Sequence, residues 1–412
     1  MKTMKNIIKC LTASLLVVNL SSCVDLDPEP LSFFAPENTF MDKEGLEALL
    51  ITSRKQIKWE WFGDAFNAGY CETPLVYEYA WSDISVMGAP EVKEIHNLET
   101  QLTPTTNMAL HLRYWDLAWN GIKYANTLIS RVPKSNIDNE DDKNQLLAEG
   151  YFHRAYWYYL LVNQWGDVPL LLEEVTGPKL DFYSTSRMKI LQQMKTDMEF
   201  AVKWLPKNVQ PGCVSRAAGE HLLAKIYLCT GDFQFAVDAT TRCINDYGLH
   251  LMKERFGVNA SDASLDVFND LFQEDNISAS ENKEAIFVVQ ERYGIEGNVA
   301  PKGSARMRNF VPYWCNGAAV KTPDGKQGTT YDAGPYEGYE WVEKLGRGIA
   351  KIRPTNYSQY AIWGKCGNDI RHNDNNWFNI SRLTYNRPAS KGGSEEYFGK
   401  PIERAFVSDT MR

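Results

Sequence analysis

The feature that most constrains the fold is a pair of helical stretches with almost nothing between them. Residues 216–230 and 233–246 each carry apolar side chains at helical spacing, and only Gly231 and Asp232 separate them. A link this short forces the two helices to fold back on each other, and the glycine suits the tight turn. The chain must therefore contain at least one helical hairpin.

The hairpin has the spacing of small and aromatic residues that is typical of a tetratricopeptide repeat. Its members are Ala224, Tyr227, Gly231, Phe233 and Ala236. Small residues let two helices approach closely, and we expect the rings to wedge the helix pair. One match alone would fit any helical hairpin. A degenerate relative precedes it, and a few such pairs would stack into a curved scaffold.

Further apolar stripes predict helices at residues 46–57, 114–129, 143–165 and 191–205. The third stripe is apolar on most faces after Tyr151, so we expect that helix to be buried. Gly166 and Pro169 should end it.

The second half of the chain changes character. Residues 285–290 form a short apolar run that predicts a strand, and glycine, proline, asparagine and tyrosine dominate after it. Long loops in an ordered protein are often functional. We therefore predict a mostly α protein, with a tetratricopeptide-like scaffold at 41–250 and a loop-rich, irregular ligand-binding part with a few short strands at 251–412.

The first residues have the charge order of a secretory signal. Lys2, Lys5 and Lys9 precede an apolar run at 11–20 that is too short to span a bilayer. The run ends in Leu-Ser-Ser-Cys, which resembles the bacterial lipobox, so residues 1–22 are predicted to be removed and Cys23 to be lipidated. The alternative is an ordinary signal peptide with a chance cysteine.

Residues 23–40 would then be the lipidated cysteine and a tether. Acids and prolines between Val24 and Pro30 suit an extended linker. They also resemble the acidic signal that sends some lipoproteins of Bacteroidota to the outer face of the outer membrane. A merely solvated linker is the other interpretation.

Charge and motifs exclude several functional classes. The net charge of −8 favours neither nucleic acid nor anionic lipid as a partner. Beyond the signal and anchor, no cysteine pair has C-x-x-C spacing, and small buried thiols are expected. No histidine pair suits a metal, and no nucleophile, nucleotide or zinc-protease motif is present. We expect no cofactor and no bound metal.

Two acidic segments are better explained without catalysis. Glu173 and Glu174 are adjacent, whereas a glycosidase needs carboxyl groups that face each other across a cleft. A solvated acidic loop is predicted there. Residues 138–142 lack the glycine and final glutamate of a calcium loop.

Aromatic residues in loop-like sequence are the candidates for ligand binding. Rings stack on the apolar faces of sugars, while polar side chains bond the hydroxyl edges. One group lies before the repeat helices and the other after residue 285, and we expect the two to converge on one face. The candidates are Trp81, Ser82, Asp83, Trp314, Asn316, Tyr339 and Trp341. For any single ring, the alternative is that it fixes a loop to the scaffold.

Several strings, in this order, resemble one family. They lie at residues 114–129, 148–170 (with Trp165-Gly166-Asp167-Val168-Pro169-Leu170 as the most recognisable part), 215–228, 282–287, 346–355 and 369–371. With the lipobox, they make the chain similar to the SusD/RagB family of outer-membrane nutrient-binding lipoproteins. Residues 41–412 would form the SusD-like domain.

The resemblance implies a function. Such a protein would sit lipid-anchored on the outer membrane and capture a glycan, or less often a peptide, for a SusC-like TonB-dependent transporter. The work would be binding, not catalysis. The alternatives are a surface α-helical glycoside hydrolase and a repeat lipoprotein that binds only protein partners. The family usually continues with another helical pair, so we expect the C-terminal end at Arg412 to be incomplete.

Overall fold

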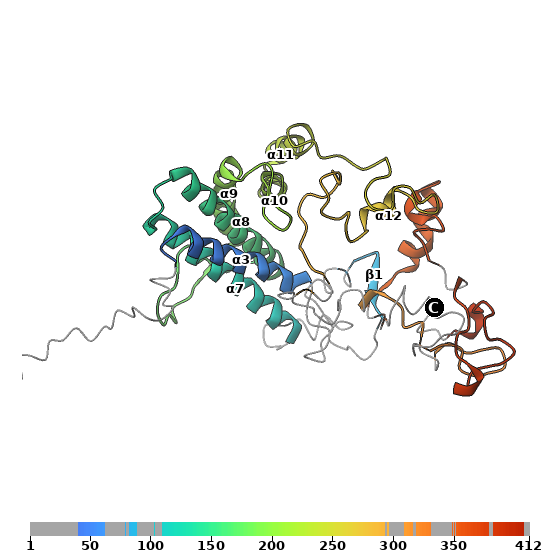
Figure 1. The fold of residues 1–412 in the computed structure, drawn as a ribbon. Coiled ribbons are helices and arrows are strands. Elements are labelled where there is room, and N and C mark those ends of the chain that lie inside the picture. Colours follow the sequence, from blue (N-terminus) through green and yellow to red (C-terminus); the bar gives the residue numbers. More distant parts are fainter. Residues whose placement is uncertain are drawn as a thin grey trace, which may run out of the picture.

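The structure, a computed structural model, describes residues 40–61, 79, 82–88, 103, 109–292, 295, 309–315, 319–330, 348, 350, 352–378 and 382–407. Helices fill its first half, and irregular chain dominates its second half (Figure 1). The helices of the first half are α3 (Lys43–Trp61), α7 (Ala109–Arg131), α8 (Glu140–Trp165), α9 (Arg187–Trp204), α10 (Arg216–Thr230) and α11 (Phe233–Asn245). From α3 and α7 through to α10 and α11, consecutive helices of this set pack on each other. This confirms the predicted helical-repeat scaffold.

The strands are few and short. β1 (Ser85–Met87) pairs antiparallel with β4 (Ile352–Pro354), and β2 (Val168–Pro169) pairs antiparallel with β3 (Ser184–Thr185). The second half adds the short helix α12 (Val267–Leu271) and several single turns. These turns are the π-helical Tyr357–Ala361 and the 3-10 turns Trp363–Lys365, Ile370–His372, Ala389–Lys391 and Arg404–Phe406, with one more at Val132–Lys134 after α7.

Helix α8 lies in the middle of the scaffold and is buried, as its sequence predicts. Trp157 and Tyr158 are fully buried in the main hydrophobic core, between neighbours from α7 and α9. Gly121 of α7 makes this possible, because a Cβ there would lie 2.0 Å from the indole nitrogen of Trp157. Gly166 ends the helix with a positive φ of 74°, where a residue with a side chain would be strained.

The acidic segments have structural roles. Asn139 caps α8 by accepting hydrogen bonds from the backbone N–H groups of Asp141 and Asp142, whose carboxylates lie at the positive end of the helix dipole. Glu173 is exposed, as predicted. Glu174 is only partly solvated, because it forms an ion pair with Arg131 at 2.8 Å. That pair fixes the segment after α8 to the end of α7.

A buried ion pair joins α8 to α9. Arg154 Nε donates to the carboxylate of Asp197 at 2.8 Å, and both side chains are almost completely buried. Arg154 also donates to the amide oxygen of Asn126 in α7 at 3.2 Å and to the carbonyl of Leu172 at 2.8 Å. The guanidinium group therefore holds α7, α8, α9 and the segment after α8 in one arrangement.

The hairpin of α10 and α11 forms as predicted, with one correction. Gly231 adopts the left-handed conformation with φ 83°, and Ala224 and Ala236 are buried where the helices meet. Phe233, however, is 64% exposed and does not wedge the pair. The ring that lies beside Tyr227 is Phe235, with 5.5 Å between ring centroids.

Residues 285–290 do not form the predicted strand. The segment has no strand partner within the described part of the chain. Ile286, Phe287 and Val289 instead pack against the helical core. A short apolar run becomes a strand only where a neighbouring strand offers backbone groups, and here the neighbours are helices.

The cysteines are free thiols at all the described positions. Cys243 and Cys315 are buried, in agreement with the expectation, but Cys366 is exposed. Cys71 lies outside the described residues. Among the helices that the structure describes, none combines the length and hydropathy that a bilayer span requires.

Overfilling the α10–α11 interface should destabilise the protein. Ala236 is 5% exposed, so Ala236→Trp should lower the free energy of unfolding by about 1–3 kcal/mol in urea denaturation. Val237→Trp is the matched control, because Val237 lies on the same helix and is 55% exposed. Equal stabilities for the two variants would contradict the packing of this hairpin.

Removing Arg154 should cost more than removing an exposed cation. Arg154→Met leaves the buried carboxylate of Asp197 unpaired and should lower the free energy of unfolding by about 3–5 kcal/mol. Lys43→Met breaks the exposed ion pair with Asp142 and should cost less than about 1 kcal/mol. Adding Asp197→Leu to Arg154→Met should restore part of the loss, and further destabilisation in that double variant would argue against the ion pair.

Candidate functional site

The two halves of the chain meet at the β1–β4 pair. Thr355, which follows β4, donates its hydroxyl to the carbonyl of Asp83 at 2.7 Å and its N–H to the carbonyl of Ile84. The Ser82 hydroxyl bonds the carbonyl of Tyr79 at 2.7 Å. Tyr79 in turn packs edge-on against Phe310, with 5.3 Å between centroids. Segments more than 200 residues apart are thus brought to one place (Figure 1).

Aromatic residues gather immediately after this junction. They are Tyr357, Tyr360, Trp363, His372 and Trp377, which we call the aromatic platform. Tyr357 and Tyr360 are 53% and 48% exposed, and both lie on the single π-helical turn that follows β4. The other three rings lie further along the same segment and contact one another. His372 stacks on Trp363 with 4.7 Å between centroids and also lies 4.7 Å from Trp377.

Charged side chains border the aromatic platform. Arg371 forms a two-pronged ion pair with Asp369, one nitrogen donating at 2.9 Å, and lies over the Trp363 ring with 5.8 Å from guanidinium to centroid. The hydrogen bonds from Arg371 lower the pKa of Asp369 to about 2. On the other side, Arg404 donates to the Tyr360 hydroxyl at 3.0 Å. Ring faces therefore stand beside charged hydrogen-bonding groups.

Asparagines fix the aromatic platform to α12. Asp266, which caps α12, accepts hydrogen bonds from the side-chain amides of Asn373 and Asn376 at 2.7 and 2.9 Å. Asn269 donates to the Asn376 side chain at 2.8 Å. These bonds lower the pKa of Asp266, against the effect of its partial burial. The platform is thus held from two directions, by β1 on one side and α12 on the other.

The ligand-binding residues predicted from the sequence do not lie together in the described structure. Ser82 and Asp83 lie at the edge of the junction, and the Asp83 side chain is exposed. The Trp314 ring is 1% exposed in a cluster with Val320 and Tyr385, so it offers no face to a ligand in this structure. The positions outside the described residues are Cys23, Trp81, Asn316, Tyr339 and Trp341.

None of the sites predicted from the sequence includes the aromatic platform. Residues 357–378 are as rich in tyrosine, tryptophan and asparagine as the groups selected, so composition alone could have drawn attention to them. Their exposure and their position beside residues 82–84 depend on contacts across the whole chain. No cluster of histidine, cysteine or acidic side chains within the described part of the chain is suited to a metal ion.

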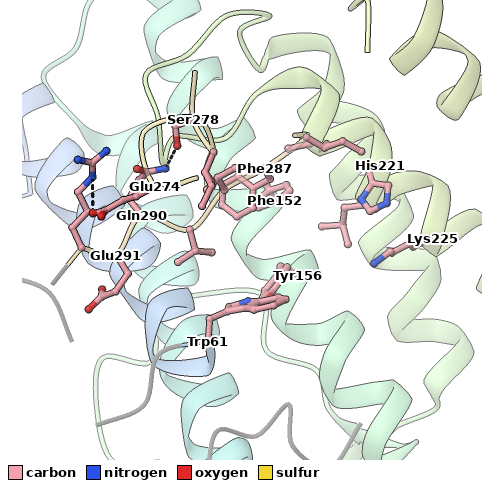
Figure 2. Close-up of a pocket in the computed structure, with 17 residues that line it drawn as sticks. Trp61, Phe152, Tyr156, His221, Lys225, Glu274, Ser278, Phe287, Gln290 and Glu291 are labelled. Atoms are coloured by element: carbon pink, nitrogen blue, oxygen red, sulfur yellow. Dashed lines mark hydrogen bonds and ion pairs between the residues drawn. The ribbon is translucent and has the colours of Figure 1, made fainter. Parts of the chain in front are cut away.

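A cavity of about 610 Å³ lies elsewhere, between α8, α10 and residues 274–292. Figure 2 shows its aromatic walls, which include Trp61, Phe152, Tyr156 and Phe287, with His221 and Lys225 on the α10 side. None of its lining residues belongs to the aromatic platform. The aromatic platform and this cavity are therefore two separate candidate sites in the described structure.

The sequence of this chain is similar to those of known proteins. Residues 72–228 match the SusD-like family described as "starch-binding associating with outer membrane". A SusD-like protein, P2, from Formosa agariphila is 29% identical over 240 residues, which cover 57% of this chain and 46% of the relative. The chain thus spans about half the length of this relative.

Solved structures show the same fold. A SusD-like carbohydrate-binding protein from Bacteroides fragilis superposes with a TM-score of 0.52 at 18% identity, covering 77% of this chain and 52% of the other. Surface glycan-binding protein A from Bacteroides thetaiotaomicron superposes with a TM-score of 0.55 at 16% identity, covering 78% and 61%. The sequence matches relate the chain to the SusD-like family, and the solved structures show that it shares the fold of SusD-like proteins.

Proposed function

We propose that this protein binds a glycan at the cell surface and hands it to a SusC-like TonB-dependent transporter, without catalysing a reaction. The observation that carries the proposal is the aromatic platform, in which two tyrosine rings are exposed, Arg404 bonds Tyr360, and Arg371 lies over Trp363. Sugars present apolar faces to rings and hydroxyl edges to such polar groups. Relatives that are named as carbohydrate-binding and glycan-binding proteins support this choice.

The platform suits an extended ligand better than a small one. Tyr357 and Tyr360 stand on an exposed turn, so the ends of a bound chain would be free to continue past them. The ion pair of Arg371 with Asp369 holds the guanidinium in place, where its remaining N–H groups can bond hydroxyls. Ser82 and Asp83 would lie at one border of the bound glycan.

The proposal includes a lipid anchor at Cys23 and a position on the outer membrane. The lipobox-like sequence before Cys23 supports it, and the matching family is described as associating with the outer membrane. Acyl chains on this cysteine would supply the membrane affinity without a transmembrane helix.

Glycan binding should depend on the two exposed tyrosines. A glycan array on the purified protein selects the ligand, and calorimetry then compares variants. Each stacked ring contributes about 1 kcal/mol, so Tyr357→Ala combined with Tyr360→Ala should weaken binding about tenfold or more. Because both rings are exposed, the far-UV circular dichroism should not change.

Tyr183→Ala is the matched control, since this tyrosine is 81% exposed just before β3. It should bind with the affinity of the parent protein. Full affinity in the platform variant would place the glycan elsewhere on the molecule. A folded protein that retains no glycan, or one that releases shortened products on incubation, would contradict the proposed function itself.

Cys23→Ala should release the protein from the membrane fraction. The test expresses both forms in cells that lack the partner transporter, so that only the acyl chains can hold the protein to the membrane. Fractionation followed by detection of the protein gives the result. A variant that still pellets with outer membranes would show that Cys23 is not the anchor.

A further inference from the structure

The cavity in Figure 2 is built by the segment that was predicted as a strand. Residues 285–290 cross the helices, and Phe287 packs edge-on against Phe152 of α8 with 5.9 Å between centroids. Gln290 donates to the Ser278 hydroxyl at 2.6 Å. Glu291 forms an ion pair with Lys58 of α3 at 2.9 Å. These contacts hold the segment in place, so the hollow behind it is preformed.

The walls of the cavity are mainly apolar. Aromatic and aliphatic side chains come from the end of α3, from α8 and α10, and from the crossing segment; they include Trp61, Phe152, Tyr156, Leu222, Ile286 and Phe287. The polar groups among them are largely engaged. The Tyr156 hydroxyl donates to Glu60 at 2.6 Å, and Gln290 and Ser278 bond each other. A sugar would therefore find few partners for its hydroxyls here.

The charges around the cavity do not cancel. Each acid at the rim has a basic partner, since Glu291 pairs with Lys58 at 2.9 Å and Glu274 lies 3.7 Å from Arg292. Lys225 makes no ion pair with any described residue, and its side chain extends from α10 toward the hollow in Figure 2. His221 lies one helical turn before it, and burial together with Lys225 lowers the pKa of this histidine. Among the described residues that line the cavity, Lys225 therefore remains as the charge without an opposite partner.

We propose that this cavity binds an amphipathic monocarboxylate, with its apolar body among Trp61, Phe152 and Phe287 and its carboxylate on Lys225. The volume of about 610 Å³ falls within the range of small-molecule sites. A single ammonium matches one carboxylate, whereas a phosphate dianion is normally held by several donors or an arginine fork. The site is separate from the aromatic platform and binds a different class of ligand.

The test uses 4-phenylbutyrate as the probe and the neutral 4-phenylbutyramide for comparison. Binding of both to the full chain is measured by calorimetry and by saturation-transfer NMR. The acid should bind saturably and about tenfold more tightly than the amide, because only the acid forms a charged hydrogen bond. Lys225→Gln should weaken binding of the acid about tenfold and leave binding of the amide unchanged.

Two controls locate the probe. Lys203→Gln removes an exposed lysine from α9, outside the cavity, and should change neither affinity. The double variant Tyr357→Ala, Tyr360→Ala should also bind the acid normally, whatever it does to glycan. Absence of saturable binding, equal affinity for acid and amide, an unaffected Lys225→Gln variant, or loss of the probe in the platform variant would each overturn the proposal.

Discussion

The scaffold depends on the buried charge of Arg154. A guanidinium group without solvent must be matched by acceptors, and here the carboxylate of Asp197, the amide of Asn126 and the carbonyl of Leu172 supply them. Because these acceptors lie on α9, on α7 and in the segment after α8, the three helices cannot slide without leaving a buried charge unpaired. The Tyr151 ring covers the guanidinium from another side, with 5.0 Å to its centroid.

The segment after α8 is held by the same network. The Tyr158 hydroxyl accepts a hydrogen bond from the Leu171 backbone N–H at 2.6 Å, and Glu174 pairs with Arg131. A loop that leaves a helix at Gly166 would otherwise be free to take several courses. Polar contacts from α7 and α8 to residues 171–174 select one of them.

Features of the fold that depend on neighbouring residues could be predicted from the sequence, and features that depend on contacts between distant segments could not. The C-terminal ends of α8 and α10 follow from local signals, the glycines at 166 and 231, and the sequence predicts both. The start of α8 at Glu140, behind its cap Asn139, lies three residues before the predicted start at 143. The conformation of residues 285–290 depends on whether strands or helices lie beside them, and the local sequence does not determine this. The burial of Trp314 and the exposure of Tyr357 likewise depend on contacts with distant segments. A pattern read along the chain cannot contain that information.

The two proposed ligand sites differ in the elements that build them. The aromatic platform belongs to irregular chain that is fixed at its borders by β1 and α12, so its rings can face solvent while their positions remain defined. A large, flexible chain of sugars needs such an open surface, because only a short stretch of it can be held at once. The cavity, in contrast, is a hollow formed by packed helices and one crossing segment, and its floor is part of the hydrophobic core. In our proposals the cavity would select by shape and by the charge of Lys225, whereas the platform would select by ring faces and hydroxyl partners. One scaffold can therefore carry both sites, because the residues that form them do not overlap.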